Sequence, residues 1–143
     1  GAETEADLAI QTIVRDAAAN ADAAIDRLAI DEAVAAIWTI VDALNGYITV
    51  NEPWALAKDE TQRERLGTVL YTAAEGLRAL AVLLSPVIPK ACEKLWIALG
   101  AAETLGRLQD QPIRQAGEWG QLKPGTSVNG LAPLFPRVES TVD

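Results

Sequence analysis

The chain has 143 residues, half of them apolar and 22% charged, and its formal net charge at pH 7 is −8. This length suits one domain with a single core, and the apolar content excludes disorder of the chain as a whole. Histidine is absent and Cys92 is the only cysteine, which excludes histidine-dependent catalysis, an intrachain disulfide and a multi-cysteine zinc site.

The charge is unevenly distributed along the chain. Residues 1–60 hold three basic and twelve acidic residues, whereas residues 61–143 hold nine basic and eight acidic ones. The chain therefore lacks the basic field on which non-specific nucleic-acid binding relies, and any such binding would need local contacts and a larger basic partner. The acidic residues follow helical patterns without a convergent spacing, so we predict neither catalytic residues nor a metal site.

The first two predicted elements are helices over residues 3–20 and 30–48. In the second, apolar residues recur at steps of four and three, which is typical of one helix face: Ile30, Val34, Ile37, Val41, Leu44 and Ile48. We expect this face, together with Trp38, to belong to the core. Asn45-Gly46 supplies a weak point near the end of this helix.

A third helix is predicted to start at Pro53, because proline is favoured in a first turn, and to run to residue 84 with a break between residues 58 and 61. Ser85-Pro86 ends it, since a residue before proline avoids the helical region. The next helix carries Trp96, a predicted core residue, and stops at Gly100. Glycines inside the third helix, Gly67 and Gly76, are expected to mark close packing.

The character of the chain changes after Gly100. Five of the ten glycines and four of the seven prolines fall in residues 101–143. We predict a short helix over 101–108, followed by loops and an extended tail anchored by Trp119. The predicted fold is all-α: an antiparallel bundle of four to five helices in residues 1–100 and an irregular C-terminal segment in 101–143.

The composition also bears on where the protein acts and on whether the chain is part of a longer one. No run approaches the roughly 18 consecutive apolar residues of a membrane span, and no signal core is present, so we expect a cytoplasmic protein with no membrane partner. The chain contains no methionine and begins Gly-Ala-Glu-Thr, as expected of a fragment of something longer.

Trp54 follows Pro53 directly at the start of a predicted helix. A tryptophan in such a place either offers a flat stacking surface or packs between the two helices that the turn joins. From these residues alone, both interpretations stay open.

Several short motifs occur in order between residues 45 and 139: Asn45-Gly46-Tyr47-Ile48, Glu52-Pro53-Trp54-Ala55-Leu56-Ala57-Lys58, Leu77-Arg78, Leu83-Leu84-Ser85-Pro86-Val87-Ile88-Pro89, Leu95-Trp96, Trp119-Gly120, Lys123-Pro124-Gly125 and Leu134-Phe135-Pro136-Arg137-Val138-Glu139. Each is weak alone. In this order and spacing they resemble the C-terminal, anticodon-binding helical domain of bacterial methionyl-tRNA synthetases.

The resemblance implies a parent enzyme that joins methionine to its tRNA through methionyl-adenylate. ATP and magnesium would act in a separate Rossmann-type catalytic domain, and this chain would hold neither a cofactor nor a catalytic residue. The implied partners are the anticodon stem-loop of tRNA(Met) and the parent's own catalytic domain.

The resemblance also implies roles for individual residues. Trp54 matches the family tryptophan that stacks on an anticodon base, an interaction worth about 1–3 kcal/mol. Lys58, one turn later, is a weaker candidate for a phosphate contact. Asn45, Tyr47 and Pro53 are expected to hold the turn rather than to touch RNA.

In the tail, Leu134, Phe135 and Arg137 would dock on the catalytic domain, or would cover the chain's own helices.

In the family, base identity is read largely by an Asn and an Arg one turn apart on the first helix, and residues 1–30 contain no Asn-x-x-x-Arg. We expect that the chain starts just downstream of that helix, so that it keeps the stacking platform without the specificity determinants.

Two alternatives remain. Other class I synthetases, such as those for valine, leucine and isoleucine, share the helical bundle, although the terminal Leu-Phe-Pro-Arg-Val-Glu segment favours methionine. A helical protein-interaction module would suit the charge of −8 and the apolar tail.

Overall fold

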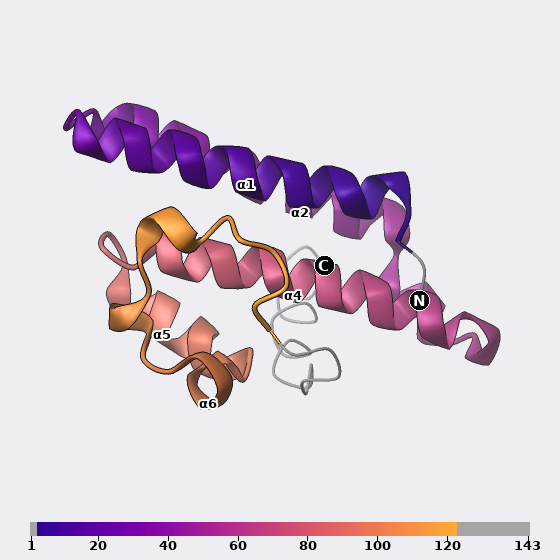
Figure 1. Cartoon of the computed structure of the whole chain (residues 1–143). Helices are drawn as coiled ribbons and strands as arrows, with labels where there is room; N and C mark the ends of the chain where they lie inside the picture. The colour runs from indigo at the N-terminus through magenta and orange to yellow at the C-terminus, as the bar shows by residue number, and fades with distance from the viewer. Residues whose placement is uncertain (1–2, 123–143) are drawn as a thin grey trace, which may run out of the picture.

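The computed structural model describes residues 3–122, which form an all-α bundle (Figure 1). Three helices of 22 residues each dominate it: α1 (Glu5–Asp26), α2 (Ile30–Asn51) and α4 (Arg63–Leu84). Shorter elements complete the fold: α3 (Pro53–Leu56), α5 (Pro89–Ala98), α6 (Ala101–Leu105) and the 3-10 turns η1 (Glu60–Gln62), η2 (Leu108–Asp110) and η3 (Ile113–Gln115). No strand occurs between residues 3 and 122, so the predicted all-α class is confirmed.

Helix α1 begins at a capping box. The Thr4 hydroxyl accepts a hydrogen bond from the backbone N–H of Asp7, whose carboxylate accepts one from the Thr4 N–H at 2.8 Å. The helix runs to Asp26, past its predicted end at residue 20, because small buried residues continue its core face: Ala17, Ala18, Ala21 and Ala24. These alanines allow α2 to lie alongside α1 as an antiparallel hairpin (Figure 1).

Helix α2 buries only part of the face predicted to be core. The prediction is confirmed for four residues that are buried or partly buried: Ile37, Val41, Leu44 and Ile48. It is wrong for Ile30 and Trp38, each 55% exposed, and for Val34, 42% exposed. The buried positions of α2 are Ala33, Ile37, Ile40, Leu44 and Tyr47, so the core face is rotated about the helix axis from the predicted one; apolar spacing alone does not fix which flank of an apolar helix is covered. Ile30, Val34 and Trp38 are called the α2 stripe below.

The turn after α2 has the predicted proline start. Helix α2 continues to Asn51, and Glu52, in the left-handed region at φ 43°, both ends α2 and precedes Pro53, the first residue of α3. The predicted break in the following helix is confirmed, since α3 ends at Leu56 and α4 begins only at Arg63.

Helix α4 is the central element of the core. Its Gly76 faces Leu44 of α2 so closely that a Cβ there would lie 2.7 Å from Leu44 Cδ2, which confirms the predicted close packing. The same prediction is wrong for Gly67, where a Cβ would meet nothing within 4 Å. Helix α4 ends before Ser85, as predicted. Trp96 of α5 is fully buried and its Nε1 donates to the Gly106 carbonyl at 2.8 Å, which confirms it as a core residue.

Residues 106–122 return across the bundle and are bonded to a fully buried ion pair on α4. Arg78 Nε donates to Glu75 Oε1 at 3.0 Å, and neither side chain is exposed. Arg78 Nη2 donates to two backbone carbonyls of the returning segment and Glu75 accepts from two of its backbone N–H groups: those of Ala116, Glu118, Gly120 and Leu122. In Figure 1 the part of this segment around η3 lies between α1 and α4.

The described part of residues 101–143 therefore packs on the bundle. The predicted short helix is present as α6 and is followed by η2. Ala101, Leu108 and Leu122 are buried in the same core as the long helices. Leu134, Phe135 and Arg137 lie outside the described residues.

Two stretches of residues 3–122 are long and apolar enough to cross a membrane by length and composition alone, Ile30–Leu56 and Glu60–Leu84. In the second, 67% of the apolar window is buried inside the protein, as in the core helix of a bundle. The first, with 28% buried, contains the α2 stripe. Two such stretches are weak evidence for a membrane span, because the packing faces of a helical bundle have the same apolar composition.

Candidate nucleic-acid interface

Trp54 lies on a short turn held by backbone hydrogen bonds. The Glu52 carbonyl accepts from the N–H groups of Ala55 and Leu56, at 2.9 and 3.1 Å. Pro53 is buried beneath the turn, whereas Trp54 is 44% exposed. The indole is thus held on an ordered backbone and presents a large part of its surface to solvent.

A polar network at the end of α2, the helix that this turn follows, joins three helices. The carboxylate of Asp7, which is not exposed, accepts from both terminal nitrogens of Arg65 at 2.7 and 3.2 Å and from the Tyr47 hydroxyl. Arg65 Nη2 also donates to Asn51 Oδ1 at 2.7 Å. Asn51 Nδ2 in turn donates to the Tyr47 carbonyl at 2.9 Å, in the last turn of α2. We call Asp7, Tyr47, Asn51 and Arg65 the clamp.

The clamp shifts the pKa values of its members. Burial alone would raise the pKa of Asp7, but hydrogen bonds from Arg65, Tyr47 and Thr4 outweigh it and lower that pKa below 3.8. Burial, together with the bond to Asp7, raises the pKa of Tyr47 to about 12. Asp7 is therefore ionised and Tyr47 neutral over the physiological range.

The residues expected to support the turn take different places. Pro53 is buried and starts α3, and Tyr47 is buried and donates to Asp7. Asn45 is exposed within α2, whose helix continues for more than a turn beyond it, and the side chain that bonds the backbone at the end of α2 is Asn51. Lys58 is exposed in the turn after α3.

The sequence reasoning missed three of the clamp residues: Asp7, Asn51 and Arg65. A signal for Asp7 was present, because it lies three residues before Ile10 and seven before Val14 on the buried face of α1. A carboxylate on a core face requires a partner. The identity of that partner, 58 residues away on α4, had no local signal.

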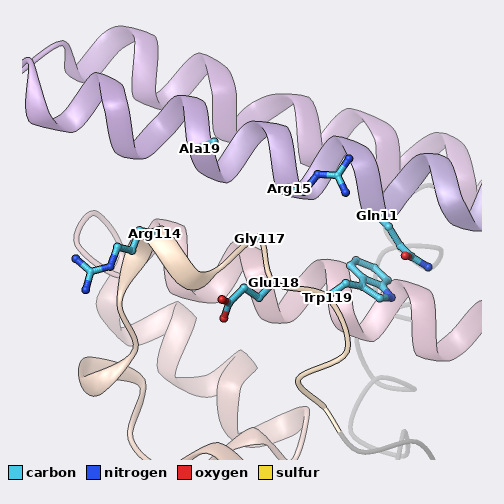
Figure 2. Close-up of a pocket in the computed structure, with 7 residues that line it drawn as sticks. All are labelled: Gln11, Arg15, Ala19, Arg114, Gly117, Glu118 and Trp119. Carbon is cyan, nitrogen blue, oxygen red and sulfur yellow. The ribbon is translucent and has the colours of Figure 1, made fainter.

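A groove of about 270 Å³ lies elsewhere, between α1 and the segment around η3 (Figure 2). Trp119 is partly buried against the core and extends toward Gln11 of α1, whereas the Arg114 side chain points away from α1. A ligand site requires polar groups that converge on one point. The polar groups that line this groove do not converge. Among residues 3–122, no cluster of three or more acidic or cysteine side chains could hold a metal ion.

Comparison with known proteins defines the class. The family model for the anticodon-binding domain of tRNA ligases matches residues 7–128, so the chain belongs to that family and the resemblance seen in its motifs is confirmed.

The similar curated proteins are methionine–tRNA ligases. The one from Streptomyces coelicolor is 45% identical over 141 residues, covering 96% of this chain and 26% of its own length. The one from Caldanaerobacter subterraneus is 41% identical, and the match covers 80% of this chain and 17% of that protein. The one from Deinococcus radiodurans is 45% identical, and the match covers 83% of this chain and 16% of that protein. The chain spans about a quarter or less of the length of these relatives.

Proposed function

We propose that this chain is the anticodon-binding part of a methionine–tRNA ligase that attaches methionine to tRNA(Met) with ATP and magnesium. The family and the similarity to methionine–tRNA ligases support this proposal over the domains of other class I synthetases. The parent's catalytic domain would carry the chemistry, and the enzyme would act in the cytoplasm. The observation that carries the binding role is Trp54, half-exposed on an ordered turn.

In this proposal Trp54 stacks on an anticodon base. A base splayed out of an RNA loop offers a flat face, and stacking on an aromatic side chain contributes about 1–3 kcal/mol without reading base identity. Lys58, exposed one turn later, is the weaker candidate for a phosphate contact. Because residues 1–30 contain no Asn-x-x-x-Arg, the chain alone is expected to bind weakly, above about 10 μM, and with little base preference.

Trp38 offers an internal comparison. It is even more exposed than Trp54, at 55% against 44%. Its helix α2, however, carries three acidic residues and no basic one, including Asp42 one turn on from Trp38. Phosphates avoid such a surface, so RNA is proposed to contact Trp54 and not Trp38.

The experiment measures the affinity of an RNA hairpin with a methionine anticodon loop, by fluorescence anisotropy at low salt. Trp54→Ala should weaken binding by about five-fold or more. Trp38→Ala, the matched control, should leave the affinity unchanged. Equal affinities for the wild type and Trp54→Ala would overturn the proposal.

The α2 stripe favours a second candidate, a helical protein-interaction module. Such a module would use Trp38 and bind RNA negligibly. Negligible binding of the anticodon hairpin by the wild type, even at low salt, would favour it.

We also propose a docking role for the tail. Leu134, Phe135 and Arg137 would dock on the catalytic domain of the parent. Twelve residues before Leu134, the Leu122 N–H donates to Glu75 Oε1 on α4 at 2.7 Å, which holds the described end of the chain on the bundle.

A further inference from the structure

We propose that Arg65 is a positioning residue for Trp54, acting through Asn51. The inference rests on the proposed function of Trp54 and concerns how that side chain is held in one orientation.

Arg65 connects two partners that belong to different helices. It donates to the Asp7 carboxylate of α1 through both terminal nitrogens and to Asn51 Oδ1 of α2 through one of them. A guanidinium can do this because its donors are held in a rigid plane, whereas an ammonium group is a point charge. The Arg65 side chain is 22% exposed and Asp7 is fully buried, so the bonds to Asp7 are largely shielded from water.

Asn51 carries this connection to the turn. It is the last residue of α2, and its side-chain amide bonds Arg65 at one end and the Tyr47 carbonyl at the other. The Tyr47 carbonyl lies in the last turn of α2, where the bond from Asn51 Nδ2 adds to the backbone hydrogen bonds of the helix. The Asn51 side chain thus holds the last turn of α2, and Arg65 holds the Asn51 side chain.

Little backbone freedom remains between Asn51 and Trp54. The ring of Pro53 restricts its own φ, and the Glu52 carbonyl is bonded to two N–H groups of α3. Glu52 itself occupies the left-handed region at φ 43° and ψ 64°. A backbone orientation set at Asn51 is therefore carried to the Cα of Trp54, which sets the direction in which the indole leaves the turn.

Positioning explains the clamp better than bulk stability does. A buried ion pair adds little net stability, because desolvation offsets most of the attraction and apolar replacements are often as stable. The clamp extends outward from the core to the polar turn, where a bond to Asn51 contributes nothing to core packing. A stacking platform, in contrast, gains affinity when its orientation is set before the base arrives.

Two variants test this without leaving Asp7 unpaired. Asn51→Ala removes the link to the turn, and Arg65→Lys keeps a cation beside Asp7 but cannot span both partners. Each should weaken binding of the methionine anticodon hairpin by about five-fold or less, a part of the full stacking contribution. The double variant should be no weaker than either single one, because both break the same connection. Asn20→Ala, on the exposed face of α1, is the control and should bind like the wild type.

A second readout follows the platform itself. In protein labelled with 5-fluorotryptophan, Asn51→Ala and Arg65→Lys should shift or broaden the 19F line of Trp54, assigned with Trp54→Phe. The line of Trp96, fully buried in α5, should stay in place as the internal reference.

The possible outcomes separate the two proposals. If Trp54→Ala weakens RNA binding while Asn51→Ala and Arg65→Lys do not, the positioning role is overturned and the proposed function stands. If Asn51→Ala weakens binding equally in a Trp54→Ala background, Asn51 acts on RNA independently and positioning is again overturned. If Trp54→Ala has no effect, the proposed function fails, whereas the 19F result still shows whether the clamp holds the indole.

Discussion

The side chains of Glu75 and Arg78 lie 3.0 Å apart, between Oε1 and Nε, with no solvent exposure, and the backbone of residues 116–122 is bonded to both. The pair thus supplies hydrogen-bond partners to backbone groups that a regular helix or strand would pair with its own backbone. It ties this segment to α4.

Glu75→Gln should destabilise the protein strongly. The amide keeps the shape of the side chain but leaves the Arg78 charge buried without its counter-ion, which costs about 3–5 kcal/mol. Urea unfolding followed by circular dichroism measures the free energy of unfolding. Glu103→Gln, at an exposed position on α6, is the control, and a loss of less than about 1 kcal/mol in Glu75→Gln would show that the pair is not needed.

Gly117 and Gly67 should respond to alanine with opposite signs. A Cβ at Gly117 would lie 2.9 Å from the Arg15 Cα, so the segment would have to move off α1, at a cost of about 1–3 kcal/mol. A Cβ at Gly67 would meet nothing within 4 Å, and alanine there should stabilise α4 by about 1 kcal/mol. Thermal unfolding of both variants checks the contrast, and destabilisation by Gly67→Ala would contradict it.

Asp7 should make stability depend on acidic pH. Its pKa in the folded protein lies below the value of 3.8 expected when unfolded, so its contribution is present above that value and is lost as pH falls through the folded pKa. Asp7→Asn should therefore be less stable than the wild type at pH 7, and the difference should narrow below about pH 4. Urea unfolding midpoints from pH 7 to pH 2 provide the measurement; a constant difference would argue against the clamp.

Tyr47 should make stability depend on alkaline pH. Its folded pKa is raised from 10.0 to about 12, so its contribution is fully present below pH 10 and is lost between pH 10 and 12. The pKa of Tyr71 is also raised to about 12, mainly by burial, so the comparison belongs in a Tyr71→Phe background. There, Tyr47→Phe should flatten the fall in stability over this range, and an unchanged fall would mean that Tyr47 does not titrate in this way.

The elements that local chemistry determines were predictable from the sequence. Pro53 starts a helix and Ser85-Pro86 ends one because the proline ring restricts its neighbours. The exposure of Trp38 was not predictable, because α2 is apolar on more than one side and the helical period does not say which of these sides is covered.

The candidate site divides in the same way. Trp54 stands out in the sequence because an aromatic follows a proline at a helix start. The clamp behind it does not, since Asp7 and Arg65 are joined only by the tertiary fold. Asn51 was overlooked in favour of Asn45, whose place in mid-helix depends on how far α2 extends.

The central claim is that RNA meets this domain at Trp54. Its most direct test follows the four indole N–H signals of the 15N-labelled protein by NMR while the methionine anticodon hairpin is added at low salt. The account predicts that the Trp54 signal shifts progressively, while the signals of Trp38 and of the buried Trp96 stay in place. A shift of Trp38 with Trp54 unmoved would contradict it.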